Sequence, residues 1–306
     1  MIFLHILLLA AGFAMLVKGA DWFVGGASGL AKKFGIPQLV IGLTIVAMGT
    51  SVPEAAVSIT AALKGSADIA VGNVVGSNIL NILVILGLAS AISPLTVRKS
   101  TFYVEIPFMA GITVVFVLLG KTGAVISRGE GILLWVLFFV YLGYLFILAK
   151  SGKEEKQESA QKTRILLFYI LAGAVVVVAG SNVTVDSATK IARILGVGDR
   201  FIGLTIVALG TSLPELVTSV VAARKGNADI AVGNIVGSNI FNILFVLGTS
   251  ALITPVPYRK GFLVDGVFAV AAGVLLWAAS GKKKELPRAG GIVMLLCYAA
   301  YFVYLL

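Results

Sequence analysis

Two glutamates, each preceded by the residues Gly-Thr-Ser-x-Pro, are the groups in this sequence best suited to binding a cation. They are Glu54 and Glu215, and the blocks that end on them repeat at a constant offset of 161 residues. Each glutamate lies inside an apolar segment, where an ionised carboxylate costs about 3 kcal/mol or more unless it faces a cavity or a partner. A protonated glutamate in a purely structural hydrogen bond is the alternative. Repetition of the whole polar block favours two half-sites that meet.

A proline directly precedes each glutamate. Pro53 and Pro214 have no N–H to donate, so the carbonyls of Gly49 and Gly210 lose their helical partners. In lipid, free carbonyls are tolerated only where they are buried in protein or line a cavity. The sequence therefore predicts a break in each helix, with backbone oxygens offered as ligands by Ala47, Thr50, Ala208 and Thr211. A purely mechanical kink is the alternative, but a kink alone would not require the neighbouring hydroxyls and a glutamate.

A second repeated block follows each glutamate and places polar residues at i, i+4 and i+8, as one stripe on a helix. The two stripes are Asn73, Ser77 and Asn81, and Asn234, Ser238 and Asn242. For any single asparagine, packing between helices is the alternative to ion binding. We expect Asn73 and Asn234 to support the site rather than to ligate an ion. We expect Asp68 and Asp229, which begin these helices, to serve as N-caps.

The donor inventory is carboxylate, hydroxyl, amide and carbonyl oxygen. Hard oxygen ligands suit Ca²⁺ or Na⁺, and also Mg²⁺. One Ca²⁺ neutralises the two glutamates, and so do two or more Na⁺ or H⁺. A single site with two ways of being neutralised is the minimum that an exchanger of cations needs.

The composition places these blocks in a membrane. The chain has 306 residues, of which 59% are hydrophobic and 12% charged, whereas soluble domains carry about 25% charged residues. The single Cys297 and the single His5 exclude a disulfide framework and a cysteine or histidine metal cluster. We attribute the net charge of +10 to topology and lipid head groups and expect no nucleic-acid partner.

Ten segments are apolar and long enough, at about 20 residues, to span a bilayer. They are Ile2–Ala27, Pro37–Ala62, Asp68–Ile92, Phe102–Leu119, Gly129–Ala149, Ile165–Leu195, Phe201–Ala223, Asp229–Ile253, Phe262–Ala279 and Ala289–Leu306. The predicted fold is an all-α polytopic membrane protein with a first five-helix repeat (1–150), a cytoplasmic linker (151–163) and a second five-helix repeat (164–306). An odd number of spans per repeat inverts the second repeat relative to the first.

Lysines and arginines set the predicted orientation. The loops on the side of the central linker hold 15 of the 24 basic residues, and the positive side of a membrane protein faces the cytoplasm. We therefore expect a cytoplasmic linker, two extracellular termini and a place in the plasma membrane.

At the paired Gly-Thr-Ser-x-Pro-Glu and Gly-Asn-x-x-Gly-Ser-Asn-Ile blocks, the sequence resembles the calcium/cation antiporter superfamily, and most of all the prokaryotic sodium/calcium exchangers. The resemblance covers essentially the whole chain. It implies inverted repeats with ion sites at their interface, and alternating access by sliding of the first and sixth helices across a fixed core.

Carried over by motif position, the resemblance implies calcium ligation by Glu54 and Glu215 with the carbonyls of Thr50 and Thr211. The implied sodium ligands are Ala47, Ser51, Ser77, Ala208, Ser212 and Ser238. Asn81 and Asn242 would flank the central position, where some family members carry aspartate. Asparagine at both positions argues against potassium co-transport, and it leaves only two carboxylates, so the stoichiometry stays open.

The predicted function is exchange of Na⁺ for Ca²⁺, without enzymatic activity or a prosthetic group. A proton-coupled cation antiporter of the same superfamily is the alternative, and the hydroxyl-rich surround favours sodium because a proton needs only the glutamates. An intramembrane hydrolase with a glutamate acid/base pair is a third possibility. The mirror symmetry of the two halves favours a bound ion over that reaction, and two buried half-sites do not make the continuous pore of a channel.

Overall fold

The computed structural model describes residues 2–152, 161–197, 206, 208–281 and 283–305. Within these residues, eight helices are long and apolar enough to cross a membrane, and a ninth span consists of two helices bent by 50° at a break. The predicted seventh span starts at Phe201, and residues 201–205 and 207 lie outside the described part of the chain. Its remainder is helical from Ala208 to Arg224 with one break. The described residues thus form the predicted all-α polytopic membrane protein, and their eight or nine spans are consistent with the predicted ten in two inverted repeats.

The first half holds α1 (Ile2–Phe34), α2 (Gln38–Ile41), η1 (Gly42–Val46), α3 (Ala47–Thr50), α4 (Val52–Leu63), α5 (Asp68–Leu80), η2 (Asn81–Leu86), α6 (Gly87–Ile92), η3 (Thr101–Glu105), α7 (Ile106–Gly123) and α8 (Arg128–Ser151). The second half holds α9 (Thr163–Ile194), α11 (Ala208–Thr211), α12 (Leu213–Arg224), α13 (Ala228–Phe241), η5 (Asn242–Leu247), α14 (Gly248–Ile253), α15 (Lys260–Ser280) and α16 (Arg288–Leu305). The segments η1, η2, η3 and η5 are π-helical, a conformation that is frequent at functional sites. The first predicted span ends too early, because α1 continues seven residues beyond Ala27 to Phe34.

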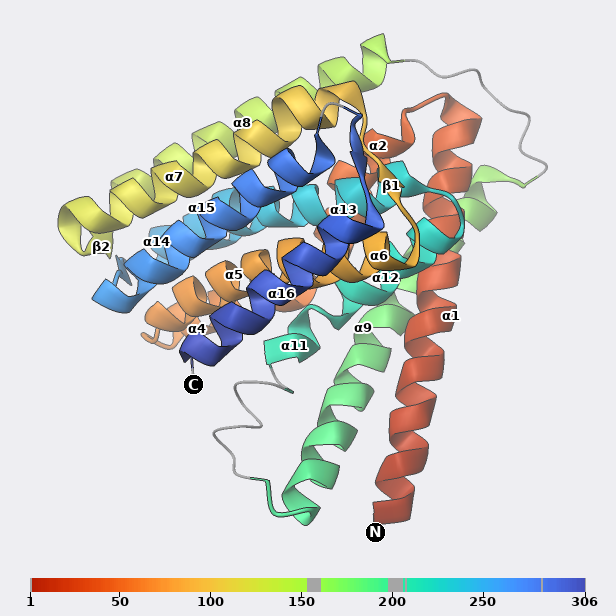
Figure 1. Cartoon of the computed structure of the whole chain (residues 1–306), viewed down its shortest axis with the longest axis horizontal. Helices are drawn as coiled ribbons and strands as arrows, with labels where there is room; N and C mark the ends of the chain where they lie inside the picture. Colours follow the sequence, from red (N-terminus) through yellow and green to blue (C-terminus); the bar gives the residue numbers. More distant parts are fainter. Residues whose placement is uncertain (1, 153–160, 198–205, 207, 282, 306) are drawn as a thin grey trace.

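Helices α1 and α9 lie side by side, at an angle to the other helices (Figure 1). Glycines make the close approach possible. A Cβ atom on Gly173 would lie 2.5 Å from the Phe23 backbone nitrogen, and one on Gly180 would lie 2.9 Å from the Leu16 nitrogen. Only a residue without a side chain fits at such distances, as in other membrane helix pairs.

The centre of the remaining helices is formed by α5 and α13, whose spans are far more buried than those of α1, α8 and α16. The outer helices expose large apolar side chains such as Phe139, Ile147 and Leu296. In a chain of this hydropathy, such surfaces face the hydrocarbon of the bilayer. The second polar block of each half therefore lies on one of the two most buried spans among the described residues.

Two short antiparallel ladders connect the halves outside the helices. Strand β1 (Leu95–Thr96) pairs with β4 (Glu285–Leu286), and β2 (Val125–Ile126) pairs with β3 (Val256–Pro257). Each ladder joins a loop of one half to a loop of the other. Strands of two residues have no signature in the sequence, which predicts helices only.

Two ion pairs also join the halves, and they correct the prediction of N-caps. Asp68 pairs with Arg259, and Asp229 pairs with Arg98. Neither aspartate caps its helix: Ala67 and Asn227 occupy the N-cap positions, without a side-chain cap hydrogen bond. The four paired residues repeat at the same offset of 161, which follows from the two-fold relation between the halves.

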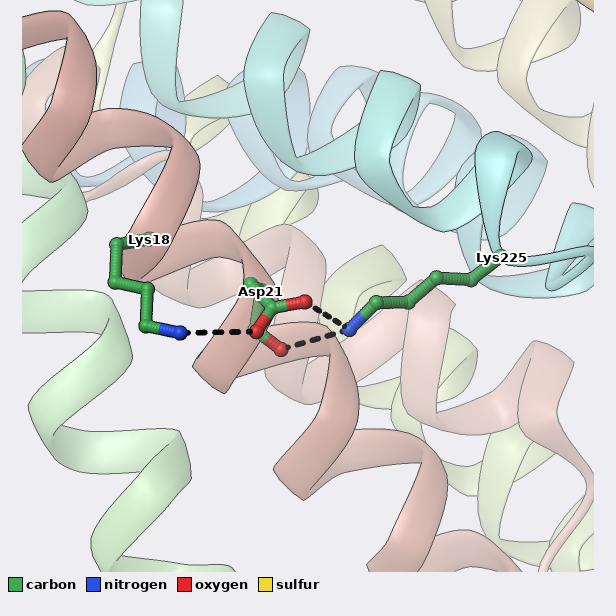
Figure 2. A network of polar contacts seen from close by, with 3 residues as sticks. All are labelled: Lys18, Asp21 and Lys225. Atoms are coloured by element: carbon green, nitrogen blue, oxygen red, sulfur yellow. Dashed lines mark hydrogen bonds and ion pairs between the residues drawn. The ribbon is translucent and has the colours of Figure 1, made fainter.

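A further ion pair ties α1 to the turn between α12 and α13 (Figure 2). Lys225 Nζ lies 2.6 Å from Asp21 Oδ1 and donates to the Asp21 backbone carbonyl at 3.0 Å. Lys18 approaches the other carboxylate oxygen, at 3.8 Å. All three side chains are partly exposed.

Candidate ion-binding site

Both glutamates stand at the predicted helix breaks. Ser51 (φ −82°, ψ 9°) separates α3 from α4, and Ser212 (φ −91°, ψ 4°) separates α11 from α12. The proline lies in the first turn of the new helix, where its missing N–H costs nothing. Glu54 and Glu215 therefore lie in the first turn of α4 and α12, near the positive end of the helix dipole, which favours a negative charge.

Each glutamate is held by a serine of the other half. Ser51 Oγ donates to Glu215 Oε1 at 2.8 Å, and Ser212 Oγ donates to Glu54 Oε1 at 3.2 Å. Both glutamates are 0% exposed, and the two carboxylates are close enough for their charges to interact. Because the bonds are reciprocal, this site forms only where the halves meet.

Four acceptor oxygens at mirrored positions are buried and receive no hydrogen bond within the described residues. They are Glu54 Oε2, Glu215 Oε2, Asn81 Oδ1 and Asn242 Oδ1. Helix α4, which carries Glu54, packs against η5, which begins at Asn242. Helix α12, which carries Glu215, packs against η2, which begins at Asn81. A buried acceptor without a donor costs about 1–3 kcal/mol, and more when it is charged. A cation in the site would satisfy these oxygens.

Four asparagines fix the orientation of the central amides. Asn78 and Asn239 each donate to the other's backbone carbonyl at 3.1 Å. Asn81 Nδ2 donates to Asn239 Oδ1 at 2.9 Å, and Asn242 Nδ2 donates to Asn78 Oδ1 at 3.1 Å. With their nitrogens engaged in this way, Asn81 and Asn242 present their amide oxygens as acceptors. The role of Asn78 and Asn239 is missed by sequence reasoning, although both lie inside the repeated block.

The asparagines that we expect to support the site hold the backbone of the glutamates. Asn73 Nδ2 donates to the Glu54 carbonyl at 3.2 Å and to Ser58 Oγ at 2.9 Å. In the second half Asn234 Nδ2 donates to the Glu215 carbonyl at 3.5 Å and to Ser219 Oγ at 2.9 Å. Ser58 and Ser219 are missed by the sequence analysis. The available signal is a serine four residues after the glutamate in both copies.

The carbonyls freed at the breaks differ in what they contact. Gly210, whose carbonyl loses its partner to Pro214, accepts a hydrogen bond from Ser181 of α9 at 2.7 Å. The Ala47 carbonyl accepts bonds from Ser51 N at 3.1 Å and Ser238 Oγ at 3.3 Å. The carbonyls of Gly210 and Ala47 thus both accept a hydrogen bond from a serine hydroxyl.

The remaining predicted ligands are placed as follows. Thr50 Oγ1 donates to Asn234 Oδ1 at 3.0 Å, and Thr211 lies beside Glu54. Ser77 is 5% exposed, and its hydroxyl has no hydrogen-bond partner among the described contacts. The backbone of Ala208 begins α11, and its side chain lies outside the described atoms.

The whole chain matches known proteins. The model of the sodium/calcium exchanger protein family matches residues 4–147 and 165–306. The chain belongs to the sodium/calcium exchanger family. Its members are transporters that exchange cations, so this protein is a membrane transporter and not an enzyme.

Two curated proteins are similar to the chain over most of its length. The inner membrane protein YrbG of Escherichia coli is 38% identical over 97% of this chain and 94% of its own length. The sodium/calcium exchanger MaX1 of Methanosarcina acetivorans is 34% identical over 100% of this chain and 99% of its own. A solved structure of the sodium-calcium exchanger NCX_Mj, soaked without Na⁺ and Ca²⁺, matches with a TM-score of 0.88 and 33% identity over the full length of both chains.

Proposed function

We propose that this transporter exchanges Na⁺ for Ca²⁺ by alternating access, with the ions bound between the repeats at Glu54 and Glu215. The observation that supports this most is the set of four buried acceptor oxygens without donors, two from the glutamates and two from Asn81 and Asn242. Donors of this kind suit a hard cation. Their two-fold arrangement supports a site at the interface of the halves.

The charges of the site account for the exchange. One Ca²⁺ between the glutamates cancels their charge of −2, with the Thr50 and Thr211 carbonyls as further ligands. Two or more Na⁺ cancel the same charge through the hydroxyls and carbonyls around it. The proposed sodium ligands are Ala47, Ser51, Ser77, Ala208, Ser212 and Ser238. Because either ion species satisfies the same carboxylates, binding of one displaces the other.

The packing of α1 against α9 supports a movement of this pair during transport. Glycine contacts such as those of Gly173 and Gly180 hold the two helices at close range, so that the pair can move as one body. The pair also lies at an angle to the other helices (Figure 1). We propose that α1 and α9 slide together over the core and open the site to each side in turn.

The distribution of Lys and Arg supports an orientation in the plasma membrane. With the linker at 151–163 in the cytoplasm and both termini outside, the loops richer in Lys and Arg face the cytoplasm. The proposed division into repeats 1–150 and 164–306 follows from the same topology.

Calcium uptake into proteoliposomes tests the proposal. Vesicles loaded with Na⁺ are compared with vesicles loaded with choline and given only a pH gradient, and ⁴⁵Ca²⁺ uptake is measured. We expect uptake that depends on the outward Na⁺ gradient and resists a protonophore. Uptake driven by the pH gradient alone would refute sodium coupling and assign the protein to the proton-coupled branch of the superfamily.

A further inference from the structure

A cavity of about 320 Å³ lies between α5, α15 and α16. It reaches the polar stripe of α5, where Asn73 and Ser77 line it, and it also reaches Asp265 of α15 and Tyr301 of α16. Asp265 lies outside both repeated blocks. The cavity thus connects one proposed sodium ligand with a carboxylate to which no role has been assigned.

Asp265 has one engaged oxygen and one available oxygen. The hydroxyl of Tyr301 donates to Asp265 Oδ1 at 2.8 Å, which holds the carboxylate in place. Among the described residues, no lysine or arginine forms an ion pair with Asp265. A carboxylate in an apolar span without a basic partner requires a cation or a proton to balance its charge.

Ser77 provides a second, independent sign of a ligand. Its side chain is more than nine-tenths buried, and its hydroxyl has no partner among the described contacts, although it lines the cavity. The mirrored Ser238 instead donates to the Ala47 carbonyl at 3.3 Å. An unpartnered hydroxyl and a carboxylate that share one cavity provide hard oxygen ligands.

The first half holds a comparable pair that serves as a reference. Tyr144 of α8 donates to Glu105 of η3, as Tyr301 of α16 does to Asp265 of α15. Glu105 is 1% exposed, and the small cavity beside it is lined mainly by apolar side chains and contains no residue of the polar stripe on α13. A carboxylate–tyrosine pair is thus present in both halves, but only the second pair opens into a cavity that leads to a proposed ligand.

We propose that Asp265, positioned by Tyr301, binds a sodium ion in this cavity on its way to or from Ser77. The inference rests on the proposed Na⁺/Ca²⁺ exchange. One carboxylate is neutralised by one Na⁺, whereas Ca²⁺ would leave a net charge of +1 in a low-dielectric surround. Asp265 would then act as a third carboxylate on the sodium route, beside the two in the central site.

The test is the sodium dependence of ⁴⁵Ca²⁺ release from proteoliposomes, with the orientation of the protein established by trypsin cleavage in the linker. In Asp265→Asn we expect the Na⁺ concentration for half-maximal release to rise by about five- to tenfold, because a neutral amide oxygen is a weaker partner for a cation than a carboxylate. The half-maximal Ca²⁺ concentration should change less than twofold. Asp265→Glu should stay close to the parent protein, and Glu105→Gln is the matched control, expected to leave both values unchanged.

An unchanged sodium dependence in Asp265→Asn overturns the proposal, as does an equal shift in Glu105→Gln or an equal shift for Ca²⁺. If Asp265→Asn does not fold, Tyr301→Phe takes its place, with an expected rise of at least about twofold; no rise in that variant also overturns the proposal. A parent protein without sodium-driven release would refute the exchange itself. An active parent with an unaffected Asp265→Asn refutes only the site at Asp265.

Discussion

At the scale of single residues, the two carboxylate oxygens of Glu54, and likewise those of Glu215, differ in their hydrogen bonding. One oxygen accepts a hydrogen bond from a serine of the other half, and the second has no donor. The serines hold the carboxylates in place without neutralising them. This arrangement suits a group that must bind an ion and then release it.

Glu54→Gln or Glu215→Gln should abolish calcium transport, with a loss of at least about 100-fold. The amide keeps the shape and the bond to serine but removes the charge that balances Ca²⁺, and loss of a buried charged partner costs about 3–5 kcal/mol. The measurement is ⁴⁵Ca²⁺ uptake per folded protein, with Glu105→Gln as a buried glutamate outside the site. Near-normal uptake in either site variant would contradict the assignment.

Asn81→Asp or Asn242→Asp should change the ion preference and leave the fold intact. Aspartate is nearly isosteric with asparagine, but it adds a negative charge where an amide oxygen now lacks a donor. An additional monovalent cation is then needed for neutrality. Transport should become more dependent on Na⁺ or pH, as measured by uptake at varied Na⁺, K⁺ and pH. Unchanged dependence on all three in both variants would exclude these positions from the site.

At the scale of elements, the contact between α1 and α9 depends on glycine at defined positions. A methyl group on Gly173 would collide with the backbone of Phe23. A methyl group on Gly143 of α8 would have no neighbouring atom within 4 Å outside its own helix backbone. These two glycines differ in what a side chain would meet. They make a matched pair for testing whether the helix contact matters for transport.

Gly173→Ala should slow transport and destabilise the protein by about 1–3 kcal/mol, the usual range for overpacking. Gly143→Ala should be neutral or slightly stabilising, because alanine is the better helix former. Melting temperature in detergent and initial uptake rate are the two readouts. Equal behaviour of the two variants would show that the glycine contact does not limit transport.

The ion pair between Asp21 and Lys225 (Figure 2) joins α1 to the core at one place. Since both side chains are partly exposed, such a pair contributes at most about 1 kcal/mol. If α1 leaves this turn during each transport cycle, Asp21→Asn and Lys225→Gln should each raise turnover by up to about fivefold. The double variant should be no faster than either single one.

Lys64→Gln is the control, because Lys64 is the mirrored residue and forms no ion pair within the described part of the chain. Additive effects or unchanged turnover would contradict this role.

At the scale of the whole molecule, the spans, the helix breaks and the relation between the halves could be predicted from periodic and repeated features of the sequence. Span Asp68–Ile92 has the predicted ends, and the breaks beside Pro53 and Pro214 lie where proline chemistry places them. The two-fold relation follows from the constant offset. These features depend on hydropathy and on the backbone, which a single sequence records directly.

Features that depend on partners across the interface are not visible in the sequence. Asp68 and Asp229 have the residue type and position of helix caps, yet arginines of the other half take their carboxylates. The hydrogen bond from Ser181 to the Gly210 carbonyl likewise requires two helices brought together in space. The same holds for the reciprocal bonds between Asn78 and Asn239.

The reciprocal serine–glutamate bonds also constrain how the protein is made. The ribosome delivers the first half to the membrane before the second exists. During that time Glu54 lacks the hydrogen bond from Ser212 and every other contact with the second half. A nascent first half must therefore keep this carboxylate protonated or close to the surface of the bilayer. Separately expressed halves should each be degraded, whereas co-expression should rescue both, because each supplies the donors that the other lacks.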